Sequence, residues 1–270
     1  MEKKFLIIDD YDDLRTALDA SFSKNGNIVT ITDNRDEGIR LMKADKYDVI
    51  ITDLDGDELV IKDEEIAEDA PECFPEEIEE EVEHRSHIKA FKICIPNFNN
   101  GKFSDEEVKT CVETILKYKS KHIDRNKDIV NRHEKIEFEI PSVLSLMHCI
   151  LEYLTKRVEK LGVVNPERSN LFVALDEAFV NAVKHGNKFD ATKNIHIIAD
   201  ITPKEARFTI EDEGEGFDVS SIPDPTAIEN LFKTSGRGVM FMYNIMDEVV
   251  YNEKGNRITM VKKSENQTEA

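Results

Sequence analysis

The sequence predicts two parts, an α/β part with a parallel sheet followed by an α+β part. The chain has 270 residues, the length of two ordinary domains rather than one. In the first part, apolar strand-like runs alternate with helical segments, and in the second, long helices precede strands joined by a turn signal. With 40% hydrophobic residues, the chain can bury two cores.

The first part alternates strands and helices from its beginning. The runs FLIID, NIVTIT and YDVIITD are short and apolar, which is typical of buried strands in a parallel sheet. Apolar residues recur at helical spacing between them. The expected strands are 5–9, 27–32 and 47–53; the expected helices carry Leu14, Leu18 and Phe22, then Ile39 and Leu41.

Residues 55–85 differ in composition, because 15 acids stand there against Lys62 and Arg85. Such a block is typical of a solvated helix or loop. After it, AFKICI predicts a strand over 90–95, and Ser104 with Glu107 forms a capping box that begins a helix over 104–119. We therefore expect a first domain over 1–120 with an acidic insert, followed by a linker or connecting helix over 121–135.

The second domain is expected over residues 136–264, with a polar tail at 265–270. Gly255 in the EKGN segment suits the turn of a closing hairpin. The expected elements are a strand at 136–140, helices near 142–161 and 167–186, strands near 194–200 and 206–212, a helix near 238–246, and strands at 248–252 and 257–262.

The overall charge and the cysteines restrict the class of protein. A net charge of −20 argues against general nucleic-acid binding and against binding to an anionic membrane, and it favours a basic protein partner. The first residues do not resemble a signal peptide, and no apolar run has the length of a membrane helix. The four cysteines (Cys73, Cys94, Cys111 and Cys149) show no CxxC spacing. We expect a cytoplasmic protein with reduced thiols.

A polar stripe marks the helix expected near 167–186. Glu177, Asn181 and His185 recur at four-residue steps, with Gly186 directly after. Because a helix turns about 100° per residue, the three side chains stay nearly aligned. The stripe therefore faces either a cavity or solvent, and a solvated face is the plainer interpretation.

Two glycine-containing segments favour a cavity. Asp212, Gly214 and Gly216 follow a strand as D-x-G-x-G, where a carboxylate can accept a hydrogen bond from an exocyclic amine and glycines let backbone approach a planar ring. Gly236 and Gly238 stand at the start of a helix, whose free N–H groups attract phosphate. A polar turn and a glycine loop without a ligand are the respective alternatives.

In this order, E-x-x-x-N-x-x-K-H-G, D-x-G-x-G and S-G-R-G-x-x-x-M resemble the histidine-kinase-like (GHKL) ATPase fold, an ATP-binding sandwich. Within that fold, residues 136–264 are similar to the bacterial anti-sigma factor serine kinases. The resemblance implies that Asn181 holds Mg²⁺ against the ATP phosphates, that Glu177 is the general base, that Lys184 lies near phosphate, and that His185 lies at the mouth of the pocket. It also implies that Asp212 reads the adenine amine, that Gly214 and Gly216 form the adenine wall, and that Gly236, Arg237 and Gly238 border the phosphates.

The implied activity is that of a protein serine/threonine kinase that uses ATP and Mg²⁺. Phosphoryl transfer depends on positioning and charge neutralisation, and a carboxylate can deprotonate the attacking hydroxyl. His133 and His148 are isolated, so we expect the phosphoacceptor on another protein. By resemblance, that partner is an anti-anti-sigma protein of the STAS type, a sigma factor is a second partner, and a homodimer is allowed.

Two other interpretations stay open. The domain can be a non-catalytic switch that binds a sigma factor when ATP is bound. It can also be a fragment of a histidine kinase, which the absence of an obvious phosphoacceptor histidine in a helix pair disfavours. The short interval between Asp212 and Gly236 also fits the anti-sigma branch, whose ATP lid is compact.

Acidic residues also end two strands of the first part. Asp9 and Asp10 end the first strand and Asp53 ends the third, so the three carboxylates are expected at one edge of a parallel sheet, where they suit Mg²⁺. FLIIDD and DVIITD resemble the receiver domain of response regulators, a flavodoxin-like fold, over residues 1–120. The resemblance implies that Asp53 accepts a phosphoryl group from an upstream histidine kinase. The alternative is that these acids only solubilise loops.

The resemblance to a receiver weakens after Asp53. Receivers carry a Ser or Thr after the fourth strand and a Lys after the fifth. Ser86 matches the first poorly, and Lys92 and Lys102 compete for the second. We therefore expect a partly degenerate receiver that controls the kinase domain, with the sign of control left open.

Overall fold

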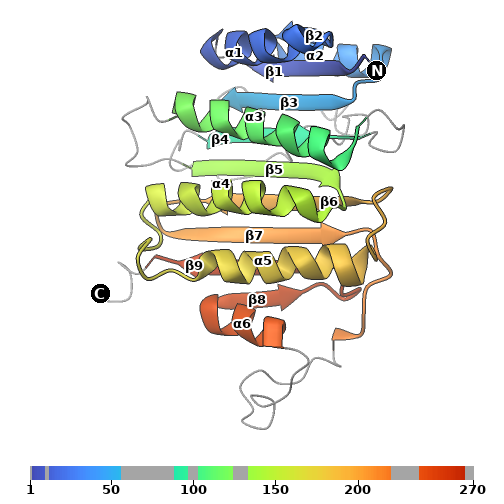
Figure 1. The fold of residues 1–270 in the computed structure, drawn as a ribbon. Helices are drawn as coiled ribbons and strands as arrows, with labels where there is room; N and C mark the ends of the chain where they lie inside the picture. The colour runs from blue at the N-terminus through green and yellow to red at the C-terminus, as the bar shows by residue number, and fades with distance from the viewer. Residues whose placement is uncertain are drawn as a thin grey trace. The chain divides into compact units, whose positions relative to one another are not determined.

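The computed structural model of the chain (Figure 1) describes residues 2–9, 12–55, 88–96, 103–123, 133–219 and 237–264. It consists of two compact units, Met1–Ile140 and Pro141–Ala270. Each unit has strands and helices of its own and is described by itself. The domain bounds at 120 and 136 stay a prediction.

The first unit is a sheet with helices on it, and its strands follow the order β2-β1-β3-β4-β5. The strands and helices predicted from the sequence all occur, with small shifts at their ends. Their bounds are β1 (Lys4–Asp9), α1 (Asp12–Phe22), β2 (Ile28–Thr32), α2 (Arg35–Ala44), β3 (Val49–Asp55), β4 (Ile88–Cys94), α3 (Asp105–Ile123) and β5 (His133–Pro141).

The direction of β4 corrects the prediction of a parallel sheet. β1 pairs in parallel with β2 and β3, as predicted, and β5 pairs in parallel with β4. However, β4 runs antiparallel to β3, with Phe91 opposite Asp53. An antiparallel neighbour does not need the crossover connection that two adjacent parallel strands require. The flavodoxin-like arrangement therefore holds for β2, β1 and β3 only, and the sheet of this unit is mixed.

Successive residues of β1 pack on opposite faces of the sheet. Leu6 and Ile8 belong to a buried cluster that packs against α2. Phe5 stacks on Phe22 of α1, with 4.4 Å between ring centroids. Each fully buried side chain of this size contributes roughly 1.5–3 kcal/mol to folding, so the alternating pattern holds a helix on each face.

Helix α3 begins with the predicted capping box. The Ser104 N–H donates to Oε2 of Glu107 over 2.8 Å, and the Glu107 N–H donates to Oγ of Ser104 over 3.3 Å. Lys3 adds an ion pair to Glu107, with 2.7 Å between Nζ and Oε1. The start of α3 is thereby tied to the residue before β1.

The second unit has the predicted α+β composition, with strand order β6-β7-β9-β8. All neighbours in this sheet pair antiparallel. Its elements are α4 (Met147–Lys160), preceded by a short 3₁₀ turn, α5 (Leu171–Asn181), continued by the π-helical segment Ala182–Gly186, then β6 (Asn194–Ile201), β7 (Glu205–Asp212), α6 (Arg237–Ile245), β8 (Glu248–Tyr251) and β9 (Arg257–Lys263).

The core of the second unit lies between this sheet and the helices α4 and α5, which run in nearly the same direction as the strands in Figure 1. Alternate residues of β6 and β7 are buried, among them Ile197, Phe208 and Ile210. Apolar residues of the helices, such as Leu154 and Phe179, are buried as well. Packing against the apolar face of the sheet therefore fixes the position of α5, and with it the position of the polar stripe.

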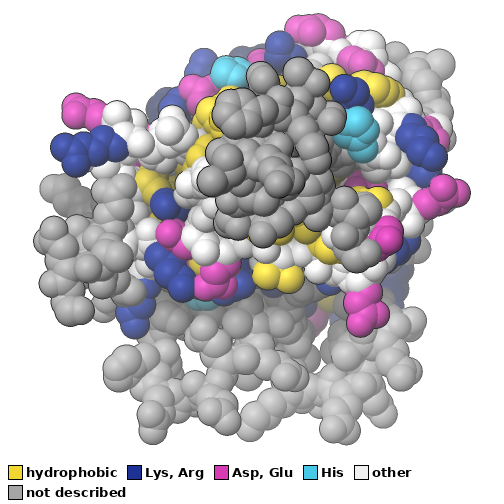
Figure 2. Space-filling model, turned by 90° about the horizontal axis from the view of Figure 1, so that it is seen from below, with side chains coloured by type: hydrophobic (Ala, Val, Ile, Leu, Met, Phe, Trp, Pro, Cys, Tyr) yellow, Lys and Arg dark blue, Asp and Glu magenta, His cyan; other side chains and the backbone are white. Residues whose placement is uncertain are grey.

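Seen from below Figure 1, acidic and basic side chains are mixed over the coloured part of the visible face, with small groups of hydrophobic side chains among them (Figure 2). That face therefore carries charges of both signs, although the whole chain is strongly acidic. Within the described ranges, none of the helices combines the length and the apolarity needed to cross a bilayer.

Candidate functional site

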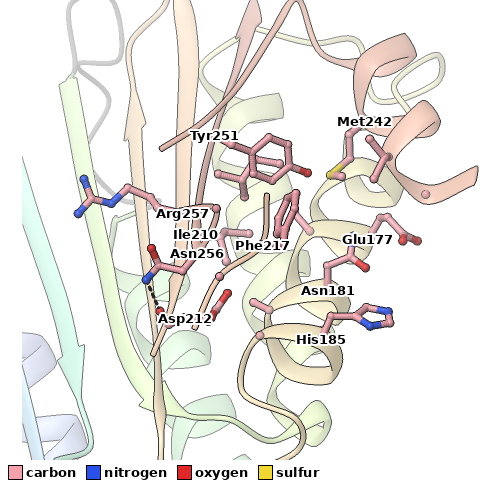
Figure 3. A pocket seen from close by; sticks show the side chains of 18 residues that line it. Glu177, Asn181, His185, Ile210, Asp212, Phe217, Met242, Tyr251, Asn256 and Arg257 are labelled. Carbon is pink, nitrogen blue, oxygen red and sulfur yellow. Dashed lines mark hydrogen bonds between the residues drawn. The ribbon is translucent and has the colours of Figure 1, made fainter. Parts of the chain in front are cut away.

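A cavity of about 390 Å³ opens in the second unit, within the size range of small-molecule sites (Figure 3). It lies between α5, the end of β7, the β8–β9 hairpin and the first turn of α6. The lining side chains that the following paragraphs use are Glu177, Asn181, His185, Gly186, Asp212, Gly216, Phe217, Gly238, Tyr251, Gly255 and Asn256.

The polar stripe of the long helix lines this cavity, with Glu177 and Asn181 partly buried and His185 exposed. Glu177, Asn181 and His185 all line it and lie one above another along the helix (Figure 3). Phe179 and Val183 are buried on other sides of the same helix and hold it against the core. Lys184 is exposed and does not line the cavity, so its role near phosphate stays a prediction.

The helix widens where it meets the bottom of the cavity. Ala182–Gly186 form a π-helical segment, and the N–H of Asn187 donates to the carbonyl of Ala182, five residues back, over 2.8 Å. Lys188 and Phe189 follow with φ of 56° and 59°, in the left-handed region that non-glycine residues rarely adopt. Such π segments and strained residues are often found at functional sites. Here they turn the chain away from the helix next to Asp212.

Asp212 ends β7 and lies directly over Gly186. Its Oδ1 accepts the N–H of Gly214 over 2.8 Å. A Cβ atom on Gly186 would overlap the Asp212 carboxylate, and a Cβ on Gly214 would come within 2.5 Å of the carbonyl oxygen of Gly186. Burial raises the pKa of the Asp212 carboxyl, an effect that the Gly214 N–H partly offsets. The two glycines therefore let the carboxylate sit close to the backbone at the edge of the cavity.

The cavity has an aromatic wall above Asp212. Gly216 and Gly255 both have φ of 76°, and each lies against the backbone of the opposite segment, so that the loop after β7 packs on the hairpin turn. The ring of Phe217, beside this contact, meets that of Tyr251 edge to face, with 5.3 Å between centroids. Burial raises the pKa of the Tyr251 phenol, which therefore stays protonated. A flat apolar ligand would pack against the aromatic rings and the backbone on this side of the cavity.

The first turn of α6 closes the cavity opposite Asp212. A Cβ atom on Gly238 would overlap the carboxylate of Glu177, so the Glu177 side chain packs directly against the backbone at the start of α6. Gly236 lies outside the described residues, as does the side chain of Arg237, whose backbone begins α6. The predicted phosphate contacts of Gly236 and Arg237 stay predictions.

The donor set of the cavity fits Mg²⁺ bound with a nucleotide. Asn181 offers one amide oxygen, and Mg²⁺ commonly keeps waters and phosphate oxygens while taking only one or two protein ligands. No group of three or more His, Cys, Asp or Glu side chains converges on one point in the part of the chain that the structure describes. This cavity therefore does not suggest a metal ion that is held by protein side chains alone.

Sequence reasoning missed two buried carboxamides beside Asp212. Asn187 and Asn256 are 1% and 7% exposed, and both contact the backbone next to Asp212. The only signal was their position, one residue after Gly186 and one after Gly255. Gly186 itself was noticed in the stripe but not assigned to the site.

In the first unit, the side chain of Asp53 is buried and paired. Asp53 is 4% exposed, lies within β3 rather than at its end, and forms an ion pair with Nζ of Lys119 on α3. The same Nζ lies 4.8 Å from the centroid of the Phe91 ring. Sequence reasoning had considered two other lysines for a place in the receiver site. Lys92 instead lies 3.4 Å from Oε2 of Glu137 on β5, and Lys102 is outside the described residues.

Asp9, the other described acid of the expected receiver site, is buried directly opposite Asp53 in the pairing of β1 with β3. Asp10 and Ser86 lie outside the described residues. A cation bound by Asp9, Asp10 and Asp53 stays a prediction.

Comparison with known proteins finds similarity in the second half of the chain. Residues 140–262 match the family of the histidine kinase-like ATPase domain, and this range contains the whole cavity. The serine-protein kinase RsbW of Bacillus subtilis (strain 168) is 27% identical over 139 residues, which are 49% of this chain and 87% of the relative. The serine-protein kinase RsbW of Staphylococcus aureus (strain JH9) is 29% identical over 140 residues, 49% of this chain and 88% of the relative.

The C-terminal part of the chain is therefore similar to histidine kinase-like ATPase domains and to the serine kinase RsbW. The family match begins at residue 140 and leaves the first unit aside. The resemblance of residues 1–120 to a receiver stays a prediction.

Proposed function

We propose that the C-terminal domain binds ATP with Mg²⁺ and transfers the γ-phosphoryl group to a Ser or Thr of an anti-anti-sigma partner in the cytoplasm. The observation that carries this proposal is that Glu177 and Asn181, the proposed base and the proposed metal ligand, line the same cavity as Asp212. The similarity to serine-protein kinases supports the same reaction class.

The proposed placement of the nucleotide follows the chemistry of the two ends of the cavity. Asp212 would accept a hydrogen bond from the adenine amine, and the Phe217 and Tyr251 rings would cover the base. Asn181 and the first turn of α6 at Gly238 would meet the phosphates, because free N–H groups at a helix start favour anions. Bound Mg²⁺ supplies charge neutralisation at the transferred group.

Glu177 is proposed to take the proton from the incoming hydroxyl. Its carboxylate lies in the cavity one helical turn before Asn181, and a positioned carboxylate contributes roughly 10²–10⁴-fold to such a step. Glu177→Ala is expected to keep ATP binding, measured by calorimetry, and to lose transfer from radiolabelled ATP to the partner. Asp176→Ala, one residue earlier and outside the cavity lining, is the matched control. Undiminished transfer by Glu177→Ala would show that the assigned role is wrong.

A non-catalytic, ATP-dependent binding switch is the second candidate. It is favoured by the contact of Glu177 with Gly238, because a carboxylate packed on α6 is not oriented toward an incoming hydroxyl. In that case the domain would capture a sigma factor only with Mg-ATP and leave the anti-anti-sigma protein unmodified. Pull-down with and without Mg-ATP, together with intact-mass analysis of the partner, separates the two functions.

The finer proposal is that the first unit regulates this domain as a receiver with Asp53 as phosphoacceptor. The buried pair with Lys119 sets a condition, since Asp53 can accept a phosphoryl group only after that pair opens. Labelling with acetyl phosphate, compared between the native chain and Asp53→Asn, tests it. Label that is lost in Asp53→Asn supports the proposal; label that Asp53→Asn leaves unchanged contradicts it.

A further inference from the structure

The peptide bond between Asp212 and Glu213 is held at both of its polar atoms by buried carboxamides. Nδ2 of Asn256 donates to the carbonyl oxygen of Asp212 over 2.7 Å (Figure 3). The N–H of Glu213 donates to Oδ1 of Asn187 over 2.9 Å. Because this carbonyl and this N–H belong to one planar peptide group, the two contacts fix its orientation from opposite ends.

Further hydrogen bonds orient each carboxamide. Nδ2 of Asn187 donates to the carbonyl of Asn194 over 2.8 Å, and Oδ1 of Asn256 accepts from Nδ2 of Asn252 over 2.9 Å. An N–H can only donate and a carbonyl oxygen can only accept, so Oδ1 of Asn187 must face Glu213 and Nδ2 of Asn256 must face Asp212. The backbone of Asn256 adds a third tie, since its carbonyl accepts the Asp212 N–H over 3.0 Å.

These contacts leave the Asp212 side chain little freedom. Its backbone is held by Asn187 and Asn256, its Oδ1 accepts the Gly214 N–H, and its carboxylate lies on Gly186. A carboxylate that has to select one base by one hydrogen bond must be fixed to within a fraction of an ångström. Buried polar groups that are fully paired provide such rigidity.

We infer that Asn187 and Asn256 are positioning residues that make the cavity selective for a base carrying an exocyclic amine. The inference rests on the proposed function, because it assumes that Asp212 reads the base of a bound nucleotide. Neither carboxamide is proposed to take part in phosphoryl transfer. Together they orient the acceptor oxygen of Asp212, Oδ2, toward the amine.

The test compares ATP with inosine triphosphate, which has a carbonyl in place of the exocyclic amine, by calorimetry with Mg²⁺. The native chain is expected to prefer ATP by about 10- to 100-fold, the value of one hydrogen bond to a charged group. In Asn187→Ala and in Asn256→Ala, the ATP affinity is expected to fall toward that of inosine triphosphate, whose own affinity stays within about twofold. Asn165→Ala, which removes an exposed carboxamide that accepts the Glu167 N–H, should keep the native preference.

A structural role alone would lower the affinity for both nucleotides equally and keep their ratio, and that result would overturn the inference. In an Asp212→Ala background, the two Asn variants should have no further effect on the ratio. If the native chain and Asn165→Ala do not bind ATP at all, the proposed function fails instead.

Amide hydrogen exchange of the nucleotide-free native chain supplies a readout that does not depend on any variant folding. The Glu213 N–H is expected to exchange slowly, like a core amide, although it follows the end of β7. Rapid exchange of that amide would show that the peptide is not held, and would overturn the inference.

Discussion

Gly186 and Asp212 share one space, because a single methyl group on Gly186 would overlap the carboxylate of Asp212. The two residues come from the π-helical segment and from the end of β7. The position of the Asp212 carboxylate therefore depends on the missing Cβ atom of Gly186. This relationship gives the most direct mutational test of the site.

Gly186→Ala is expected to displace the Asp212 carboxylate and to abolish ATP binding. Insertion of a methyl group into a packed site costs about 1–3 kcal/mol of stability. Urea unfolding followed by circular dichroism measures that loss, and calorimetry measures binding. The double variant Gly186→Ala, Asp212→Ala should regain the stability without regaining ATP affinity. Native affinity in Gly186→Ala would show that Asp212 is not held at this place.

Asp212→Asn is expected to make the fold more stable above the usual titration range of an aspartate. Burial raises the pKa of Asp212 above 3.8, so ionisation is less favourable in the folded than in the unfolded chain. The stabilisation that this group contributes is therefore fully present below pH 3.8, and it is lost as the pH rises through the raised pKa of the folded state. The free energy of unfolding of Asp212→Asn, relative to that of the native chain, should increase over that pH range and then stay constant. Urea unfolding at several pH values measures this difference. An advantage that shrinks with rising pH would contradict the assigned direction.

Lys119→Met should strongly destabilise the first unit, because it leaves the Asp53 carboxylate buried without its cation. Both side chains of the pair are 5% exposed, and breaking a buried pair from one side costs about 3–5 kcal/mol. The double variant Asp53→Leu, Lys119→Met should lose much less, since no charge stays buried. Thermal unfolding compares the two. Equal losses would show that the pair is not the reason for the destabilisation.

Glu107→Gln tests the tie between α3 and Lys3. The hydrogen bond from Lys3, and after it that from the Ser104 N–H, lowers the pKa of Glu107 to about 2. A lowered pKa means that the stabilisation is present above 4.5 and disappears as pH falls toward 2. Because the Glu107 side chain is 53% exposed, the loss at neutral pH should stay below about 1 kcal/mol.

Glu106→Gln, one residue earlier on the same first turn, controls for the loss of a charge near the start of α3. A difference between the two variants that persists at pH 2 would show that the ion pair is not its source.

Much of the local structure was predictable, because helix and strand periodicities are written in residues a few positions apart. This approach found the capping box at Ser104 and Glu107, and the helical stripe of Glu177, Asn181 and His185 that lines the cavity. The stripe was interpretable as a site only when D-x-G-x-G was considered with it. The direction of β4 was not predictable, because residue patterns within a strand do not specify which way its neighbour runs.

By itself, the sequence determined the order of strands and helices, the start of α3, and a nucleotide motif set that later matched the histidine kinase-like ATPase domain. Only the tertiary structure decided that Lys119 neutralises Asp53, and that Asn187 and Asn256 hold the peptide after Asp212. These partners are 66, 26 and 44 residues apart. Contacts at such separations depend on how the sheets and helices pack, and no local pattern records them.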